Sequence, residues 1–233
     1  MQIGLSGIVI VVGNYGSGKT EVAINLAVHQ HRLGAKVRMA DLDLVNPYFR
    51  TREARTPLSA LGIEVVLPPE RLMQADLPIL MPQVAGLIRA PGDLAILDVG
   101  GDDAGATVLA SLADVFKDSN QPTLMIQVVN PFRPNTDSVE RCLGMRRAIE
   151  ASARMPVQKW VGNANFMDET TVDHIYQGDA FMASLKAASG LEVEFLTVPH
   201  HILPQIDTSR LSRPVLPIYR QLVPPWQKAV TLP

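Results

Sequence analysis

The sequence predicts a three-layer α/β fold, in which a mostly parallel, twisted sheet carries helices on both faces. Short apolar segments alternate with helical patterns along most of the chain, which is typical of strand–helix–strand units. The segment GIVIVV at residues 7–12 is a continuous, largely β-branched run, as expected for a strand buried on both faces. Polar and glycine residues follow several of the apolar segments. In such folds, ligands bind at that edge of the sheet.

The individual elements follow from the spacing of apolar residues. Expected strands lie at residues 7–12, 36–43, 93–101, 123–130, 157–163 and 194–199. Helices are expected at residues 19–33, 71–89, 104–116, 136–154 and 170–188. In the first helix, Glu21, Asn25 and His29 fall on one polar stripe, so we expect His29 to face solvent. No repeat or linker divides the chain, and we expect residues 1–233 to form one domain.

The composition is that of a folded protein, and it excludes several classes of function. Of 233 residues, 47% are hydrophobic and 19% charged, and the formal net charge is −2. A nucleic-acid-binding domain usually has a basic excess, so we predict no nucleic-acid partner. No apolar segment reaches the roughly 18 residues that span a bilayer, and the start lacks a basic leader. We therefore expect a cytoplasmic protein without a membrane anchor.

The chain has one cysteine, Cys142. A single cysteine cannot form an internal disulfide or a Cys-x-x-Cys metal site. Because Cys142 lies in a helical pattern, we expect a packed thiol without chemistry of its own.

The segment GNYGSGKT at residues 13–20 fits the phosphate-loop pattern G-x-x-x-x-G-K-[ST] completely, between an expected strand and an expected helix. Glycines allow the backbone to curl around an anion with its N–H groups inward, and the helix adds its positive dipole end. Lys19 is expected to reach the β- and γ-phosphates, and the Thr20 hydroxyl to coordinate Mg²⁺. The expected nucleotide contacts are Gly13, Asn14, Tyr15, Gly16, Ser17, Gly18, Lys19 and Thr20.

Carboxylates lie at the ends of two further strands, where a Mg²⁺–nucleotide site needs them. The segment MADLD ends with Asp41 and Asp43, and the segment AILDVGG carries Asp98 before two glycines. For Asp41, capping of the strand end is the favoured interpretation. Asp102 and Asp103, which come next, are expected to cap the start of a helix.

The loop, the DLD segment, the DVGG segment and SRPVLPI at residues 212–218 resemble the MinD/ParA group of P-loop ATPases. This group belongs to a wider class that includes the nitrogenase iron protein and the signal-recognition GTPases. The resemblance spans most of the chain. It implies a P-loop NTPase fold with ATP or ADP and Mg²⁺ as ligands, and slow ATP hydrolysis by a molecular switch.

The resemblance also implies roles for single residues. Asp43 matches the switch I aspartate, which lies near Mg²⁺ and orients the attacking water, so Lys19 and Asp43 are the expected catalytic residues. Asp98 matches the Walker B aspartate, which holds Mg²⁺ through water. Gly101 matches the switch II glycine, whose N–H senses the γ-phosphate.

One position departs from the group. MinD/ParA proteins usually carry a second lysine after the first glycine of the loop, donated across a homodimer, whereas this chain has Asn14. A homodimer is still one expected assembly, and an arginine could replace that lysine. Arg50, Arg52 and Arg55 are candidates, although a solvated basic helix start explains them equally well.

The base is expected between two later strand ends. Asn163 matches the asparagine that contacts the base in MinD-like proteins, and Asn165 is close enough to compete. Pro199 and His200 would close the other side. No Asn/Thr-Lys-x-Asp motif argues for guanine, and ATP is favoured by the resemblance. Since His200 and His201 are adjacent at a strand end, we do not expect them to share a metal.

Two other functions remain open. One is an ATP-dependent kinase or ligase, similar to dethiobiotin synthetase, that acts on a small anionic substrate. Arginines of the segments PYFRTREAR and NPFRP could hold that substrate. The other is a nucleotide-binding scaffold without turnover. The sequence names neither a protein client nor a small-molecule acceptor, so either is an expected partner.

Overall fold

The computed structural model describes residues 3–43, 55–66, 81–223 and 228–233. Its sheet has eight strands: β1 (Gly7–Gly13), β2 (Val37–Leu42), β3 (Glu64–Val66), β4 (Leu94–Val99), β5 (Thr123–Val129), β6 (Lys159–Gly162), β7 (Val193–Pro199) and β8 (Val215–Ile218). The strands lie in the order β3-β2-β4-β1-β5-β6-β7-β8. Every neighbouring pair is parallel, so all the carboxyl ends lie at one edge.

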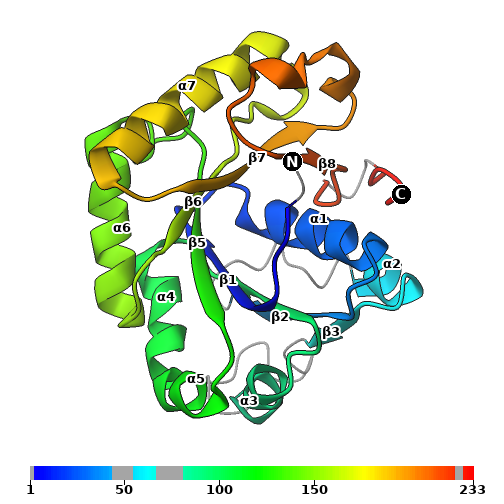
Figure 1. The fold of residues 1–233 in the computed structure, drawn as a ribbon, viewed down its shortest axis with the longest axis vertical. Coiled ribbons are helices and arrows are strands. Elements are labelled where there is room, and N and C mark those ends of the chain that lie inside the picture. Colours follow the sequence, from blue (N-terminus) through cyan, green and yellow to red (C-terminus); the bar gives the residue numbers. More distant parts are fainter. Residues whose placement is uncertain (1–2, 44–54, 67–80, 224–227) are drawn as a thin grey trace.

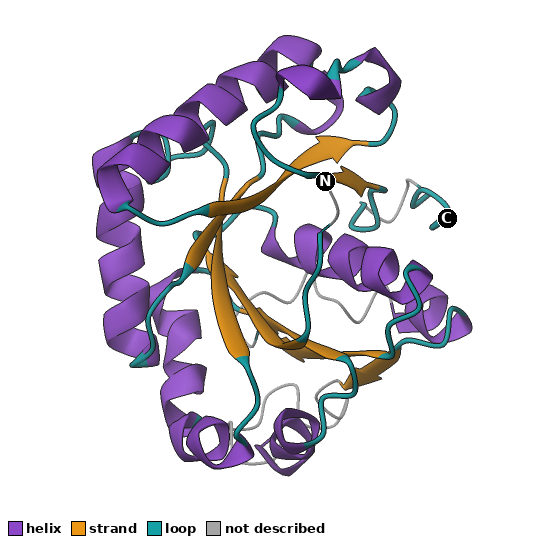
Figure 2. Cartoon of the chain, viewed as in Figure 1, coloured by secondary structure: helices purple, strands orange, loops and turns teal. Residues whose placement is uncertain are grey.

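Helices form a layer on each face of the sheet (Figures 1 and 2). One layer contains α1 (Lys19–Arg32) and α2 (Arg55–Ala60), and the other contains α3 (Met81–Arg89), α4 (Asp102–Ser111), α5 (Ala113–Ser119), α6 (Val139–Ala153) and α7 (Val172–Ser189). Three short 3₁₀ turns complete the described elements: Met167–Glu169, Leu203–Gln205 and Thr208–Arg210. The three-layer α/β expectation is confirmed.

The central strand β1 is buried along its whole length, which explains its continuous apolar sequence. Val9 and Val11 point to the layer of α1. Ile8 and Ile10 point to the opposite layer, where α3, α4 and α6 pack. The alternating side chains of β1 therefore pack into two separate cores, one on each face of the sheet. Because both faces are packed, the position of the loop after Gly13 relative to the sheet is set.

Some expected elements differ from the structure. The helix expected at 104–116 is two helices, α4 and α5, which meet at Leu112. Of the helix expected at 71–89, residues 71–80 lie outside the described residues and the remainder is α3. The strands β3 and β8 and the helix α2 were not expected. In β8, Pro217 is tolerated because β7 is the only neighbour of this strand in the described sheet.

The polar stripe of α1 packs against the C-terminal segment. Asn25 is buried, and its amide accepts from Tyr219 N (2.8 Å) and donates to Tyr219 O (3.3 Å). Glu21 accepts from the backbone N–H groups of Gln221 (2.7 Å) and Leu222 (3.0 Å). The expectation that His29 faces solvent is wrong, since the ring is half-buried and desolvation lowers its pKa. A polar stripe on a helix can bind backbone groups as well as water.

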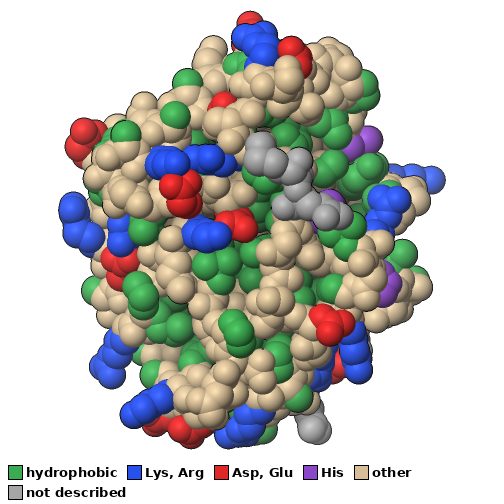
Figure 3. All heavy atoms as spheres, in the orientation of Figure 1, with side chains coloured by type: hydrophobic (Ala, Val, Ile, Leu, Met, Phe, Trp, Pro, Cys, Tyr) green, Lys and Arg blue, Asp and Glu red, His purple; other side chains and the backbone are tan. Residues whose placement is uncertain are grey.

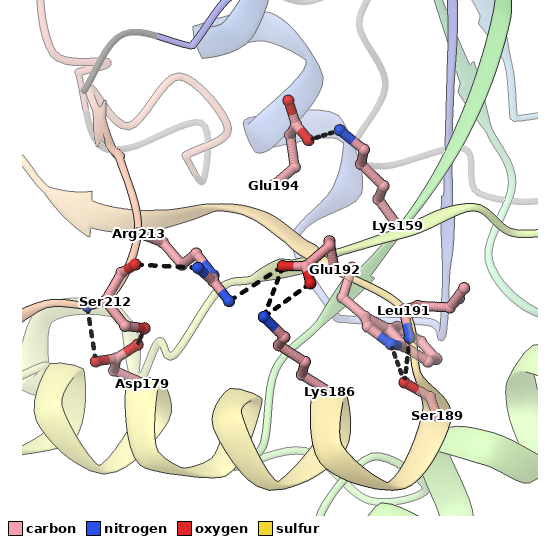
Figure 4. A network of polar contacts seen from close by, with 10 residues as sticks. Lys159, Asp179, Lys186, Ser189, Leu191, Glu192, Glu194, Ser212 and Arg213 are labelled. Atoms are coloured by element: carbon pink, nitrogen blue, oxygen red, sulfur yellow. Dashed lines mark hydrogen bonds and ion pairs between the residues drawn. The ribbon is translucent and has the colours of Figure 1, made fainter.

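A second polar network fixes the connection from β7 to β8 (Figure 4). Asp179 on α7 accepts from Ser212 N (3.2 Å) and Ser212 Oγ (2.7 Å). Glu192 pairs with Lys186 (2.7 Å) and Arg213 (3.2 Å), and the hydrogen bond from Lys186 lowers its pKa. These contacts hold the segment before β8 on α7, and through it the residues at the carboxyl end of β8.

The charged surface has no dominant sign on the face shown in Figure 3, where acidic and basic side chains are interspersed with apolar ones. In the described part of the chain, no helix combines the length and the apolarity that crossing a bilayer requires.

Replacing Asn25 tests the attachment of the C-terminal segment. In Asn25→Ala, Tyr219 N–H loses its side-chain acceptor, whereas Tyr219 C=O keeps the Gln221 amide as a side-chain donor. We therefore expect the free energy of unfolding to fall by about 1–3 kcal/mol. Urea denaturation measures this change. Arg32→Ala, at an exposed position of the same helix, serves as the control and should stay within about 0.5 kcal/mol of wild type. Equal stability of the two variants would contradict the attachment.

Candidate functional site

The expected phosphate loop connects β1 to α1 at the centre of the carboxyl edge. Gly13 ends the strand, Gly18 is the N-cap of the helix, and Lys19 is its first residue. Gly16 and Gly18 have φ of 73° and 87°, in the left-handed region that favours glycine. The sequence pattern therefore folds locally into a tight turn that presents a helix N-terminus.

Two carbonyl groups of the loop, those of Asn14 and Ser17, accept hydrogen bonds from side chains. Lys19 Nζ donates to Asn14 O (3.1 Å), and Asn163 Nδ2 donates to Ser17 O (2.7 Å). The backbone N–H of Ser17 also donates to Asn14 O (3.1 Å). These bonds fix the direction of the peptide groups, and the buried Ser17 hydroxyl has no hydrogen-bond partner in the described part of the chain.

Residues from β2 and β4 converge on the same loop. A methyl group placed on Gly101 would lie 2.9 Å from Tyr15 Cα and 3.2 Å from Lys19 Nζ, and one placed on Gly100 would lie 3.1 Å from Asp43 Oδ1. Only glycine permits this approach. The glycines after β4 therefore bring the backbone of this segment against the phosphate loop.

The oxygen donors expected at the metal are all buried: Thr20, Asp43 and Asp98. Asp41 and Asp98 are register partners on neighbouring strands. The capping role expected for Asp41 is confirmed, because its Oδ1 accepts from Asp43 N (2.9 Å). Asp102 and Asp103 do not occupy the N-cap position of α4, which is Gly101, but lie in the first turn.

A cavity of about 370 Å³ opens over the loop, within the size range of small-molecule sites. It runs from the phosphate loop to the ends of β6, β7 and β8. Its lining includes Tyr15, Gly16, Gly18, Lys19, Thr20, Asp43, Asn163, Pro199 and His200 from the expected site. The structure thus brings together residues that are far apart in the sequence.

Asn163 lies at the end of β6 and joins three elements. Besides donating to Ser17 O, its amide accepts from the Thr197 hydroxyl of β7. On the other side, His200 stacks on Tyr219 with ring centroids 4.8 Å apart. The expected base-contacting residues therefore line one end of the cavity and are fixed by their own contacts.

Several residues of the cavity were not expected at a nucleotide site. Asp168 and Arg220 form an ion pair (3.0 Å) at its rim, and Glu21, Leu222 and Val230 also line it. Burial raises the pKa of Glu21, and the backbone donors described above act in the opposite direction. The polar stripe of α1 was the only sequence signal for Glu21, and it did not indicate a partner.

Other expectations have separate outcomes. Arg50 and Arg52 lie outside the described residues, and Arg55 begins α2 with its side chain also outside them. Cys142 is buried as expected, and desolvation raises the pKa of its thiol to about 12, which disfavours the thiolate at neutral pH. Among the described residues, no group of three or more His, Cys, Asp or Glu side chains could hold a metal ion.

No protein-family model matches the sequence, and no curated protein matches it. Solved structures do share its fold. The signal recognition particle receptor FtsY from Elizabethkingia anophelis, in complex with GDP, has a TM-score of 0.58 at 16% identity over 85% of this chain and 59% of its own. The signal recognition particle 54 kDa protein from Aeropyrum pernix, in complex with GDP, has a TM-score of 0.55 at 19% identity, over 84% of this chain and 42% of its own.

The cell division protein FtsY from Thermotoga maritima has a TM-score of 0.59 at 19% identity, over 83% of this chain and 62% of its own. This chain therefore spans about 42–62% of the lengths of these three proteins. At such identities the likeness confirms the α/β fold of P-loop NTPases. It does not single out the MinD/ParA group.

Replacing a glycine tests the geometry of the loop. In Gly18→Ala, the added methyl would lie 2.2 Å from Asn163 Nδ2, and alanine is strained at the φ of 87°. Asn163 must move and Ser17 O loses its donor, so we expect the free energy of unfolding to fall by about 1–3 kcal/mol. Gly144 lies within α6, and a methyl group added there would meet no atom within 4 Å apart from the backbone of its own helix. Gly144→Ala should therefore raise the free energy of unfolding by about 0.5–1 kcal/mol. If both variants unfold at the same urea concentration, the described loop geometry is wrong.

Proposed function

We propose that this protein binds a nucleoside triphosphate with Mg²⁺ and hydrolyses it slowly, as a molecular switch of MinD/ParA type. The observation that carries the proposal is the complete phosphate loop, with buried Lys19 facing a cavity of nucleotide size. A phosphate chain would bind the N–H groups of Gly16, Gly18 and neighbouring residues, as anions bind at helix N-termini.

The residues present fit Mg²⁺. Thr20, Asp43 and Asp98 offer hard oxygen donors, and Mg²⁺ is usually bound through one or two carboxylates together with phosphates and water. A site of this kind needs no cluster of three acidic side chains. Bound Mg²⁺ would neutralise phosphate charge, while Asp43 would orient the attacking water and Lys19 would hold the terminal phosphates.

The switch would consist of the segments around Asp43 and Gly101. Asp43 lines the same cavity as Lys19, and Gly101 lies beside Lys19. A γ-phosphate that accepts from Gly101 N–H would hold this segment, and hydrolysis would release it. The resulting change would alter affinity for a second copy of the chain or for a protein client.

The base is proposed to lie between Asn163 on one side and Pro199 and His200 on the other. Each amide atom of Asn163 keeps capacity for one further hydrogen bond, so its contacts with Ser17 and Thr197 leave room for a base. Adenine is the first candidate by resemblance. Guanine is the second, because two neighbours of the fold are complexes with GDP and the Asp168 carboxylate could accept from guanine N–H groups.

Turnover with both nucleotides tests the proposal. The purified protein is incubated with Mg²⁺ and equal ATP and GTP, and both diphosphates are measured by chromatography. We expect slow hydrolysis that Lys19→Ala lowers by about 100-fold or more, because a charged donor to the terminal phosphates is lost. If the wild type hydrolyses GTP in preference to ATP and Asp168→Asn does not, guanine is the base that the protein binds, and Asp168 contacts it.

Three outcomes would contradict the proposal in part or in whole. Binding without hydrolysis would favour the scaffold, or the kinase or ligase that turns over only with an anionic second substrate. Hydrolysis that persists in Lys19→Ala, or no binding of either nucleotide, would reject the proposed site itself.

A further inference from the structure

The connection from β5 to α6 places an arginine on the nucleotide cavity. Arg133 lines the cavity together with Lys19 and Asn130. Its side chain is half-buried, and its Nε is buried without a hydrogen-bond partner in the described part of the chain. Since Nε is covered by protein atoms, an anion in the cavity would bind the terminal nitrogens of the guanidinium, which carry four of its five N–H donors.

The turn that carries Arg133 is fixed by its own hydrogen bonds. Arg133 N donates to Asn130 O (3.1 Å), and the Thr136 hydroxyl donates to the same oxygen (2.7 Å). Phe132 N donates to Asn130 Oδ1 (3.1 Å). Since both sides of Arg133 are anchored, its backbone is held in place before any ligand binds, as a binding residue requires.

The same turn is attached to the phosphate loop. Asn14 Nδ2 donates to Pro134 O (2.9 Å), the carbonyl next to Arg133. The carbonyl of Asn14 in turn accepts from Lys19 Nζ. Arg133 is therefore linked through two hydrogen bonds to the lysine that faces the terminal phosphates. Asn14 itself is neutral, and its amide is engaged by this contact.

Of the three arginines on the neighbouring helix α6, two have carboxylate partners within the chain, and the third, Arg147, is exposed to solvent. Arg141 pairs with Asp137 (2.9 Å) and Arg146 pairs with Glu150 (2.9 Å). No ion pair involves Arg133 among the described residues. The guanidinium on the cavity is thus left to bind an anion that enters it.

We propose that Arg133 donates to a phosphate oxygen of the nucleotide bound in its own chain. It supplies a second positive charge on the cavity besides Lys19, from a turn outside the phosphate loop. This inference rests on the proposed nucleotide site. The same chemistry would suit the anionic group of a second substrate, and the experiment separates these sources.

Binding of non-hydrolysable triphosphates tests the inference. Calorimetric titration with AMP-PNP and with GMP-PNP in the presence of Mg²⁺ gives the Kd for wild type, Arg133→Gln and Arg133→Lys. We expect Arg133→Gln to raise the Kd of the preferred analogue about tenfold or more, because a charge-assisted hydrogen bond is lost. The Kd of Arg133→Lys should lie between those of wild type and Arg133→Gln. Arg141→Gln, at an exposed position on the neighbouring helix α6, is the control and should leave the Kd unchanged.

The outcomes distinguish this inference from the proposed function. If Lys19→Ala abolishes binding but Arg133→Gln and Arg133→Lys bind as wild type does, Arg133 does not contact the nucleotide and the inference alone is wrong. The inference would also be wrong if Arg133→Gln bound the nucleotide as wild type does but no longer turned over an added anionic substrate. If the wild type binds neither analogue, both proposals fail. Should Arg133→Gln not fold, Arg133→Lys carries the test, with an expected rise in Kd of about threefold or more.

Discussion

A loop that turns its N–H groups toward an anion must turn its carbonyl groups away, and buried carbonyls need donors. In this protein, the ammonium group of Lys19 and the amide of Asn163 are those donors. The second comes from β6, and it also binds Thr197 of β7. The shape of the phosphate loop therefore depends on the register of strands that lie on the far side of β5.

The far end of the cavity depends in a similar way on a segment remote in sequence. Glu21 and Asn25 follow the phosphate loop on α1, and they bind the backbone of residues 219–222. That segment places Tyr219 against His200 and Leu222 on the cavity. One helix thus begins with phosphate-loop residues and continues with the residues that hold the opposite wall.

Sequence predicted what is determined locally. The apolar run of β1, the glycines of residues 13–20 and the carboxylates at the ends of β2 and β4 each indicate their structure within a few residues. It did not predict β8, because Pro217 and a short run do not read as a strand until β7 lies beside them. The burial of Asn25 was also beyond it, since it depends on Tyr219, which lies more than a hundred residues away. The arginine of NPFRP was a candidate for an anionic ligand from the sequence, but the attachment of its turn to the phosphate loop through Asn14 and Pro134 was not predicted.

The most direct test of the account is a crystal structure with Mg²⁺ and a non-hydrolysable triphosphate. The account predicts that the β-phosphate lies within residues 13–20, against the N–H groups around Gly18, with the metal on the Thr20 hydroxyl and the base between Asn163 and His200. Density for the nucleotide elsewhere on the protein, or an empty loop at saturating concentration, would contradict it.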